Sequence, residues 1–458
     1  MTDSLRHTIE THWRGWCDAL DQDGQWIQIH LPLPETTPLR WLQTHPHMQA
    51  FYWSSRDGHT EVAGIGAADV LSADSHRALL AALRQAKQRL STSSLPVHYY
   101  GGARFAPSVA PAPEWADFGT GHFVAPRFAF RRDKDQHLFV FQALLQPSTA
   151  EGLARQKDTL LQEVDAFSWD AHPESYLQAT ANDPLQALER VEVPEQDGWE
   201  TQLQHALKSF EESALQKIVL ARRLALRFQT PVSPTQLLHA LKKRAEGTYS
   251  FLFQIDTKNT FLGATPELLF RRHGQIVESE ALAGTRSRGK TPEEDEALGR
   301  ELLETEKEVH EHQIVLEVLT EHFAELCHTY KVETQLALRK LRHIQHLLST
   351  IHGEIKEDVD DFTILQTLHP TPAVGGRPRG QALELIQQLE PFDRGWYAAP
   401  VGWFGADAAE FVVGIRSALV QGKQVSLYAG AGIVPGSDPT HEWVETEKKL
   451  TPFVELFS

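Results

Sequence analysis

Apolar residues in the first third of the chain occur in short runs and alternations that predict strands. The segments WIQIHLPL from Trp26, AFYWSS from Ala50 and HLFVFQALL from His137 have this pattern. The segment DSHRALLAALRQAKQRL instead repeats apolar residues at helical spacing, and Asp74 or Ser75 can cap its first turn. This region is therefore expected to mix strands with helices.

The remaining chain carries sharper signals. The segments KIVLARRLALRF, SFLFQI, TFLGATPELLF, FVVGIRSALV and QVSLYAGAG are predicted to be strands. Two helix starts combine a capping residue with a following proline. Thr291-Pro292 opens a helix expected to run unbroken to about Cys327, and Asp438-Pro439 opens the last helix. The polar, basic segment GTRSRGK is expected to be a loop.

The order of these elements predicts an α+β fold. Strands and helices do not alternate strictly, which disfavours a doubly wound parallel sheet. A polar stretch with several prolines, residues 169–198, is the expected junction between two parts of the chain, 1–190 and 191–458.

Composition and charge narrow the class of protein. The 458 residues include 41% hydrophobic and 23% charged residues, as in an ordinary globular protein. The formal net charge is −17, so no general binding to nucleic acid or an anionic membrane is expected, and an anionic substrate would need local cations or a metal ion. Two distant cysteines, no apolar signal segment and no long apolar run predict a cytoplasmic protein with free thiols.

Two pairs of glutamates have a spacing that suits metal binding. Glu308 and Glu311 are three residues apart in one predicted helix, and Glu442 and Glu445 are three apart in another. Residues at this spacing share a helix face, so four carboxylates can converge around a cation. Hard oxygen ligands favour Mg²⁺ or Ca²⁺. The alternative is that both are solvated acidic helix faces.

Two further residues are candidates for acid and base chemistry. Lys217 begins a strand that is apolar on both faces, where desolvation would lower its pKa, although a lysine at a strand end can also reach water. Glu267 lies in the apolar segment ATPELLF, where burial would raise its pKa and make it a general acid. The alternative is an edge residue at a bulge.

Other residues suggest binding functions. Arg416 is flanked by small residues on its strand and can bind a carboxylate or form a structural ion pair. The segment YAGAGIVPG does not fit a dinucleotide loop, but Gly430 allows close approach of the backbone to a ligand. His343, His346 and His352 are expected on a polar helix face, with metal binding there disfavoured.

These segments together resemble the chorismate-utilising enzymes. The matching motifs occur in the family's order across roughly residues 195–455, and they are KIVLAR, GATPELLF, EALAGTRSRG, EKEVHEH, LHPTPAVGG, EPFDRGWYAAPVGW, VVGIRSA and YAGAGIVPGSDPTHEWVETEKKL. The branch that makes isochorismate is the most similar. The segment FYWSSRDG, from Phe51, resembles the branch of the menaquinone pathway.

The resemblance implies a fold and a reaction. The expected fold is two packed β-sheets flanked by helices, to which residues 1–190 contribute strands in the same core. The implied reaction adds water at C2 of chorismate and removes the C4 hydroxyl. Lys217 matches the base that activates water, and Glu267 matches the acid that protonates the departing hydroxyl. Anthranilate synthases, which use ammonia, have another residue where this chain has Lys217.

The resemblance also implies a set of binding residues. Mg²⁺ is expected to be held by Glu311 and Glu445, with Glu308 and Glu442 acting largely through water. The groups expected at the two carboxylates of chorismate are Gly284 and Thr285 beside the ring carboxylate, and Arg416, Gly430 and Lys449 at the enolpyruvyl carboxylate. No flavin, redox cofactor or obligatory protein partner is expected.

Two rival functions remain open at this point. A salicylate synthase of the same family keeps the lysine and goes on to eliminate pyruvate. A catalytically silent chorismate-binding subunit is the second rival, and the apparent completeness of the set Lys217, Glu267, Glu311 and Glu445 argues against it.

Overall fold

The computed structural model describes residues 1–33, 37–45, 48–106, 110–167, 186–333 and 335–457. Its helices are α1 (Thr2–Asp18), α2 (Pro38–Leu42), α3 (His76–Ser91), α4 (Ala150–Ala166), α6 (Gln196–Glu212), α7 (Pro234–Arg244), α8 (Pro292–Glu304), α9 (Glu306–Leu326), α10 (Asp361–Leu368), α11 (Arg379–Leu389) and α12 (Pro439–Val454). A short 3-10 helix covers Pro113–Phe118.

The strands are β1 (Gln25–Pro32), β2 (Ala50–Ser54), β3 (Thr60–Ser72), β4 (Tyr99–Ala103), β5 (Gly121–Asp133), β6 (Gln136–Leu145), β7 (Ala187–Val193), β8 (Lys217–Phe228), β9 (Tyr249–Gln254), β10 (Asn259–Thr265), β11 (Leu268–His273), β12 (Ile276–Ser287), β13 (Cys327–Val332), β14 (Ala337–Lys340), β15 (Ile344–Ile355), β16 (Gly376–Arg377), β17 (Pro400–Phe404), β18 (Ala408–Val413), β19 (Ser417–Gln421) and β20 (Gln424–Ile433). Every pairing found among them is antiparallel.

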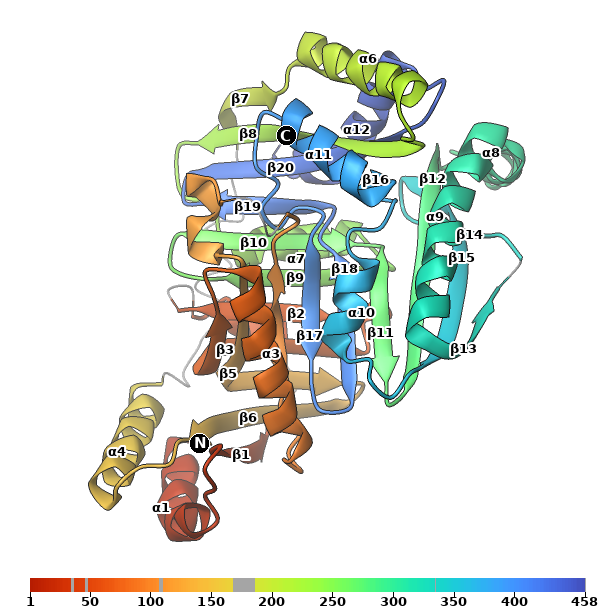
Figure 1. Ribbon diagram of the computed structural model, residues 1–458. Coiled ribbons are helices and arrows are strands. Elements are labelled where there is room, and N and C mark those ends of the chain that lie inside the picture. The colour runs from red at the N-terminus through yellow and green to blue at the C-terminus, as the bar shows by residue number, and fades with distance from the viewer. Residues whose placement is uncertain (34–36, 46–47, 107–109, 168–185, 334, 458) are drawn as a thin grey trace.

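The strands form two sheets that are joined along one strand (Figure 1). The first runs in the order β7-β8-β20-β19-β10-β9-β2-β3-β5-β6-β1. The second runs from β5 through β4, β17, β18, β11 and β12 to β15. Strand β5 pairs with β3, β4 and β6, so hydrogen bonds continue from one sheet into the other. The expected α+β fold of two sheets flanked by helices is confirmed.

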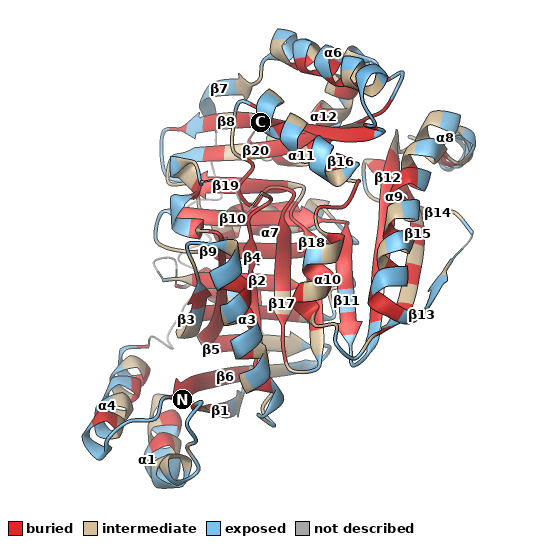
Figure 2. Ribbon diagram, viewed as in Figure 1, coloured by how far each residue is buried: buried red, intermediate tan, exposed pale blue. Residues whose placement is uncertain are grey.

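Two apolar layers stabilise this arrangement. Along β9, Phe251 and Phe253 pack into one core cluster, while Leu252 between them packs into the other. The first cluster includes buried residues of both sheets, and the second lies where α1, α2, α4, α7 and α12 cover the first sheet. Figure 2 shows the consequence, with buried strands inside and helices whose outer faces are exposed. Alternation of side chains along antiparallel strands produces these two layers.

Strands from the N-terminal part pair with strands from the rest of the chain. β2 lies beside β9, and β4 lies beside β17. The boundary expected near residue 190 falls within β7, which pairs with β8. Most of the expected junction, residues 168–185, lies outside the described residues.

Three local expectations were wrong. The helix opened by Pro292 is divided at Thr305, whose ψ of 111° leaves the helical region, so α8 and α9 are separate. The segment expected as a polar loop is strand through Ser287, because its backbone pairs with β15 despite its polar side chains. His346 and His352 lie on β15 rather than on a helix, since that segment is the partner of β12.

No helix in the described ranges has the length and apolar character needed to span a membrane.

Candidate active site

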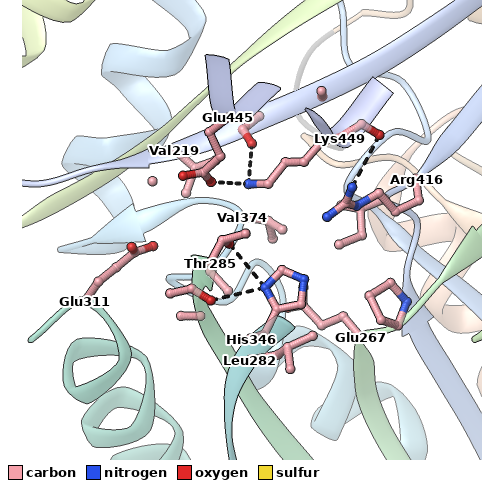
Figure 3. Close-up of a pocket in the computed structure, with 18 of the residues that line it drawn as sticks. Val219, Glu267, Leu282, Thr285, Glu311, His346, Val374, Arg416, Glu445 and Lys449 are labelled. Carbon is pink, nitrogen blue, oxygen red and sulfur yellow. Dashed lines mark hydrogen bonds and ion pairs between the residues drawn. The ribbon is translucent and has the colours of Figure 1, made fainter. Parts of the chain in front are cut away.

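The residues expected to act together surround one pocket at the end of the first sheet (Figure 3). It lies between β8 and β20 on one side and β12 and β15 on the other, with α9 and α12 supplying carboxylates. Eight of the eleven expected site residues line it, and these are Glu267, Gly284, Thr285, Glu311, Arg416, Gly430, Glu445 and Lys449. Of the other three, Lys217 contacts Glu311 and Glu308 accepts a hydrogen bond from Thr285, both lining residues, whereas Glu442 pairs with Lys307.

Lys217 is buried at the first position of β8. Its side chain has no exposed surface, which rules out the alternative that it reaches water. The ammonium nitrogen lies 2.9 Å from a carboxylate oxygen of Glu311 on α9. A charged lysine can remain in such surroundings only with a partner of opposite charge. Lys217 and Glu311 therefore connect the first sheet to α9 at the pocket wall.

Glu267 follows Pro266 in the turn between β10 and β11 and is 4% exposed. Its backbone carbonyl accepts a hydrogen bond of 3.1 Å from the Val413 amide, which fixes the turn against β18. The pKa of its carboxyl is raised to about 8, chiefly by burial, while the charge of Lys217 lowers this pKa and that of Glu280 raises it. Glu267 is therefore largely protonated at neutral pH and can donate a proton to a bound molecule.

Arg416 and Lys449 supply positive charge to the pocket. Arg416 has a positive φ of 49° between β18 and β19, and burial lowers its pKa to about 10. Its guanidinium donates a 3.3 Å hydrogen bond to the Lys449 carbonyl, and within the described part of the chain it forms no ion pair. Lys449 on α12 donates to the Gly430 carbonyl at 2.8 Å and to Glu445 at 2.6 Å. Arg416 is thus available for an anion, as expected of a carboxylate-binding residue.

Glu311 of α9 and Glu445 of α12 line the pocket, and Glu308 and Glu442 lie three residues before them on the same helices. They are not solvated acidic faces, because the Glu311 side chain is 14% exposed, that of Glu445 26% and that of Glu442 2%. Burial, and then the charge of Glu311, raises the pKa of Glu308, and burial followed by Glu445 raises that of Glu442. Four such carboxylates repel one another unless cations lie near them.

Each of these glutamates has a partner within the protein. Lys217 pairs with Glu311, Lys449 with Glu445 and Lys307 with Glu442, while Glu308 accepts a 2.9 Å hydrogen bond from the Thr285 amide. In the described ranges, no three His, Cys, Asp or Glu side chains are grouped closely enough to hold a metal ion. The donor set nevertheless suits Mg²⁺, which prefers carboxylate oxygens.

Glycines allow the backbone to approach these side chains. A Cβ atom at Gly432 would lie only 2.3 Å from a carboxylate oxygen of Glu311. At Gly430 it would lie 3.0 Å from the Tyr397 hydroxyl, and Gly284 has a φ of 74° beside Glu308. Larger residues at these positions would displace the groups that line the pocket.

Several lining residues were missed from the sequence. His346 was expected on a helix, but its Nδ1 lies 3.1 Å from the Gly284 carbonyl and its ring lines the pocket (Figure 3). Burial lowers the pKa of His346 to about 3, so the ring is neutral. Tyr397 and Tyr428 also line the pocket, with ring centroids 5.2 Å apart. Their position depends on strand pairing across the chain, which no local pattern indicates.

Comparison with known proteins decides the family. The model of a family described as chorismate binding enzyme matches residues 14–458. This chain belongs to the chorismate-binding enzymes. The match includes every candidate site residue and both sheets.

Relatives and solved structures of this family agree over nearly the whole chain. Isochorismate synthase MenF of Escherichia coli is 32% identical over 431 residues, which cover 92% of this chain and 91% of that protein. MenF of Bacillus subtilis is 31% identical over 88% of this chain and 87% of that protein. The solved structure of E. coli MenF, described as menaquinone-specific, has a TM-score of 0.84 and 28% identity, with 99% of this chain and 100% of that one covered.

A more distant solved structure shares the fold. Anthranilate synthase component I of Streptococcus pneumoniae has a TM-score of 0.64 and 17% identity over 93% of this chain and 92% of that one. The fold is therefore shared with a structure of a different name.

Proposed function

We propose that this chorismate-binding enzyme is an isochorismate synthase that interconverts chorismate and isochorismate. One observation carries the proposal, namely that Glu267, whose buried carboxyl has a raised pKa, lines a pocket together with Glu311, the carboxylate that contacts the buried Lys217. Adding water at one ring carbon and losing a hydroxyl at another requires such a base and acid. Relatives named isochorismate synthase cover about nine-tenths of the chain.

Binding of the substrate follows from the charges of the pocket. Chorismate carries two carboxylates, and the protein has a net charge of −17, so binding needs local positive charge. Arg416 and Lys449 fit the enolpyruvyl carboxylate beside the backbone at Gly430. Gly284 and Thr285 fit the ring carboxylate. Holding both carboxylates orients the ring between base and acid.

Glu311 and Glu445 would hold Mg²⁺, with Glu308 and Glu442 contacting it through water. The ion would supply positive charge to a substrate carboxylate. The fit rests on Glu311 and Glu445, which both line the pocket, and on the charge of each acting on Glu308.

The proposed reaction assigns one proton transfer to each of two residues. Lys217, in its neutral amine form, accepts a proton from the water whose oxygen forms a bond to C2, and the ammonium so formed is balanced by Glu311. The ring double bond shifts, the C4–oxygen bond breaks, and Glu267 donates its proton so that the C4 hydroxyl departs as water. In the reverse direction Glu267 acts as the base and Lys217 as the acid.

Product analysis tests the proposal. The purified chain, incubated with chorismate and Mg²⁺ and analysed by chromatography, should form isochorismate without salicylate or pyruvate. Salicylate together with pyruvate would instead identify a salicylate synthase, and complete absence of turnover would identify a silent binding subunit. A role in menaquinone synthesis is supported by the MenF relatives, and is tested by restoring menaquinone in a bacterium that lacks its own isochorismate synthase.

A further inference from the structure

The segment FYWSSRDG of the N-terminal part extends from β2 into the turn before β3 and reaches two buried carboxylates of the catalytic region. Trp53 donates its indole N–H to Glu410 at 3.3 Å. Arg56 binds Glu280, which lies 224 positions further along the chain. Glu410 and Glu280 are 5% and 6% exposed, so neither carboxylate can rely on water.

Arg56 forms more than an ion pair. Its two terminal nitrogens contact the two carboxylate oxygens of Glu280, each at 2.6 Å, in a bidentate arrangement. One of them also donates a 2.8 Å hydrogen bond to the carbonyl of Pro266, the residue immediately before Glu267. The guanidinium lies over the ring of Tyr249, 4.7 Å from its centroid. A planar guanidinium held at this many points has little freedom to move.

Arg339 provides an internal comparison. It donates to the same carboxylate, with 3.0 Å between its nitrogen and an oxygen of Glu280, but it has no hydrogen bond to Pro266. Its side chain is 22% exposed and that of Arg56 is 16%. The two arginines therefore share the role of balancing Glu280, and only Arg56 also holds the turn that carries Glu267.

We propose that Arg56 is a positioning residue for Glu267: it fixes the turn through the Pro266 carbonyl and balances the buried charge of Glu280 that faces the catalytic carboxyl. The inference rests on the proposed function, in which Glu267 is the acid. It gives the N-terminal part a direct effect on the reaction. The hydrogen bond to Pro266 positions Glu267, and the contact with Glu280 affects the electrostatic field around the Glu267 carboxyl.

The charges around Glu267 come from several elements. Glu280 on β12 raises the pKa of Glu267, whereas three cations lower it. The groups that face Glu267 are Lys217 on β8, Glu280 on β12, Tyr397 before β17, Arg416 before β19 and Lys449 on α12. Of the charged groups in this set, Glu280 alone raises the pKa of Glu267. A substitution that removes the charge of Glu280 should therefore lower the pKa of Glu267.

Two variants separate placement from charge. Arg56→Lys keeps the positive charge, but a single ammonium cannot span both oxygens of Glu280 and the Pro266 carbonyl. We expect kcat to fall by about tenfold or more with KM changed little, because displacement of a catalytic group by about 1 Å can cost up to about 10²-fold. The matched control Arg339→Lys likewise keeps its charge beside Glu280, leaves the Pro266 bond intact and should stay within about threefold of the unaltered enzyme in kcat.

The second variant, Glu280→Gln, keeps the shape of the side chain and removes its charge. The alkaline limb of the profile of kcat/KM against pH should move to lower pH, because the pKa of Glu267 falls when the facing negative charge is removed. A purely structural role of Glu280 would lower activity at every pH without moving this limb. Thermal unfolding of each variant, monitored by circular dichroism, checks that each variant is folded under the conditions of the assay.

The outcomes distinguish this inference from the proposed function. If the unaltered enzyme forms isochorismate but Arg56→Lys matches Arg339→Lys in kcat, the positioning role of Arg56 is wrong. An alkaline limb that stays in place in Glu280→Gln contradicts the electrostatic part, even if Arg56→Lys does not fold. If the unaltered enzyme forms no isochorismate, the proposed function itself has failed.

Discussion

The proposed function of Glu267 in catalysis comes with a cost in stability. Its pKa is raised by burial from 4.5 to about 8. Between these pH values the unfolded chain releases a proton that the folded protein retains, so stability falls as pH rises through this interval. The carboxyl contributes no such penalty below pH 4.5, where both states are protonated. This is the pattern expected of an acid that is kept neutral by its surroundings.

Substituting Glu267 by Gln should therefore stabilise the protein in alkaline solution. The variant cannot ionise, and we expect its free energy of unfolding to exceed that of the unaltered protein by about a few kcal/mol near pH 8.5, with little difference near pH 5. Urea denaturation at the two pH values measures this. A stability difference that is the same at both would contradict the raised pKa.

The same substitution should also remove catalysis. Gln keeps the shape and hydrogen bonding of Glu267 but has no transferable proton, so kcat should fall by about 10²–10⁴-fold with a small change in KM. Initial rates from chorismate and from isochorismate should fall together, because one group acts in both directions. Loss in one direction alone, or a raised KM with kcat intact, would make Glu267 a binding residue.

Lys217 is expected to act in turnover rather than in binding. Lys217→Ala should form no isochorismate while still binding chorismate, as measured by calorimetry, because the carboxylates are assigned to other groups. The matched variant Lys449→Ala should instead weaken chorismate binding, since Lys449 lies beside Arg416. Turnover by Lys217→Ala would show that another group activates the water, and loss of binding would make Lys217 a substrate anchor.

At the scale of elements, α9 and α12 determine the proposed metal site. Glu311→Gln and Glu445→Gln should weaken Mg²⁺ binding in calorimetry and nearly abolish activity, because each removes a direct ligand. Glu308→Gln and Glu442→Gln should have smaller effects, of about 10–100-fold in affinity, if they act through water. Glu317→Gln is a matched control on α9, since Glu317 is 64% exposed and pairs with Arg377. Unchanged Mg²⁺ binding in the Glu311 and Glu445 variants would remove these residues from the site.

The elements also show which features a sequence can predict. Helix starts at Thr291 and Asp438 were predicted correctly, because each capping side chain accepts a hydrogen bond from a backbone amide three residues ahead. The break at Thr305 carried no proline or glycine signal. The strand conformation of Arg286 and of His346 was missed because it depends on pairing between β12 and β15, about 60 residues apart. At these positions the pairing between distant strands determines the conformation, and the local sequence preference does not.

At the scale of the molecule, the two joined sheets bring distant motifs to one pocket. The motifs around Lys217, Glu267, Arg416 and Lys449 are short, so their chemistry could be recognised along the chain. Their convergence could be expected only through resemblance to a family, since no periodicity places β8 opposite α9. The contact of Arg56 with Glu280 lay beyond prediction, because neither residue carries a local signal for the other. The N-terminal part thus contributes to the catalytic region through contacts that only the fold displays.

The central claim is that water attacks C2 while the C4 hydroxyl departs. The origin of the oxygen in the C2 hydroxyl can be traced with an isotope. The purified enzyme should be incubated with chorismate and Mg²⁺ in H₂¹⁸O, and the isochorismate formed should be isolated early and analysed by mass spectrometry. Our account predicts that each molecule of isochorismate carries one heavy oxygen, located in the C2 hydroxyl. Isochorismate without the label, which would mean that the original hydroxyl had migrated within the substrate, or no isochorismate at all, would contradict it.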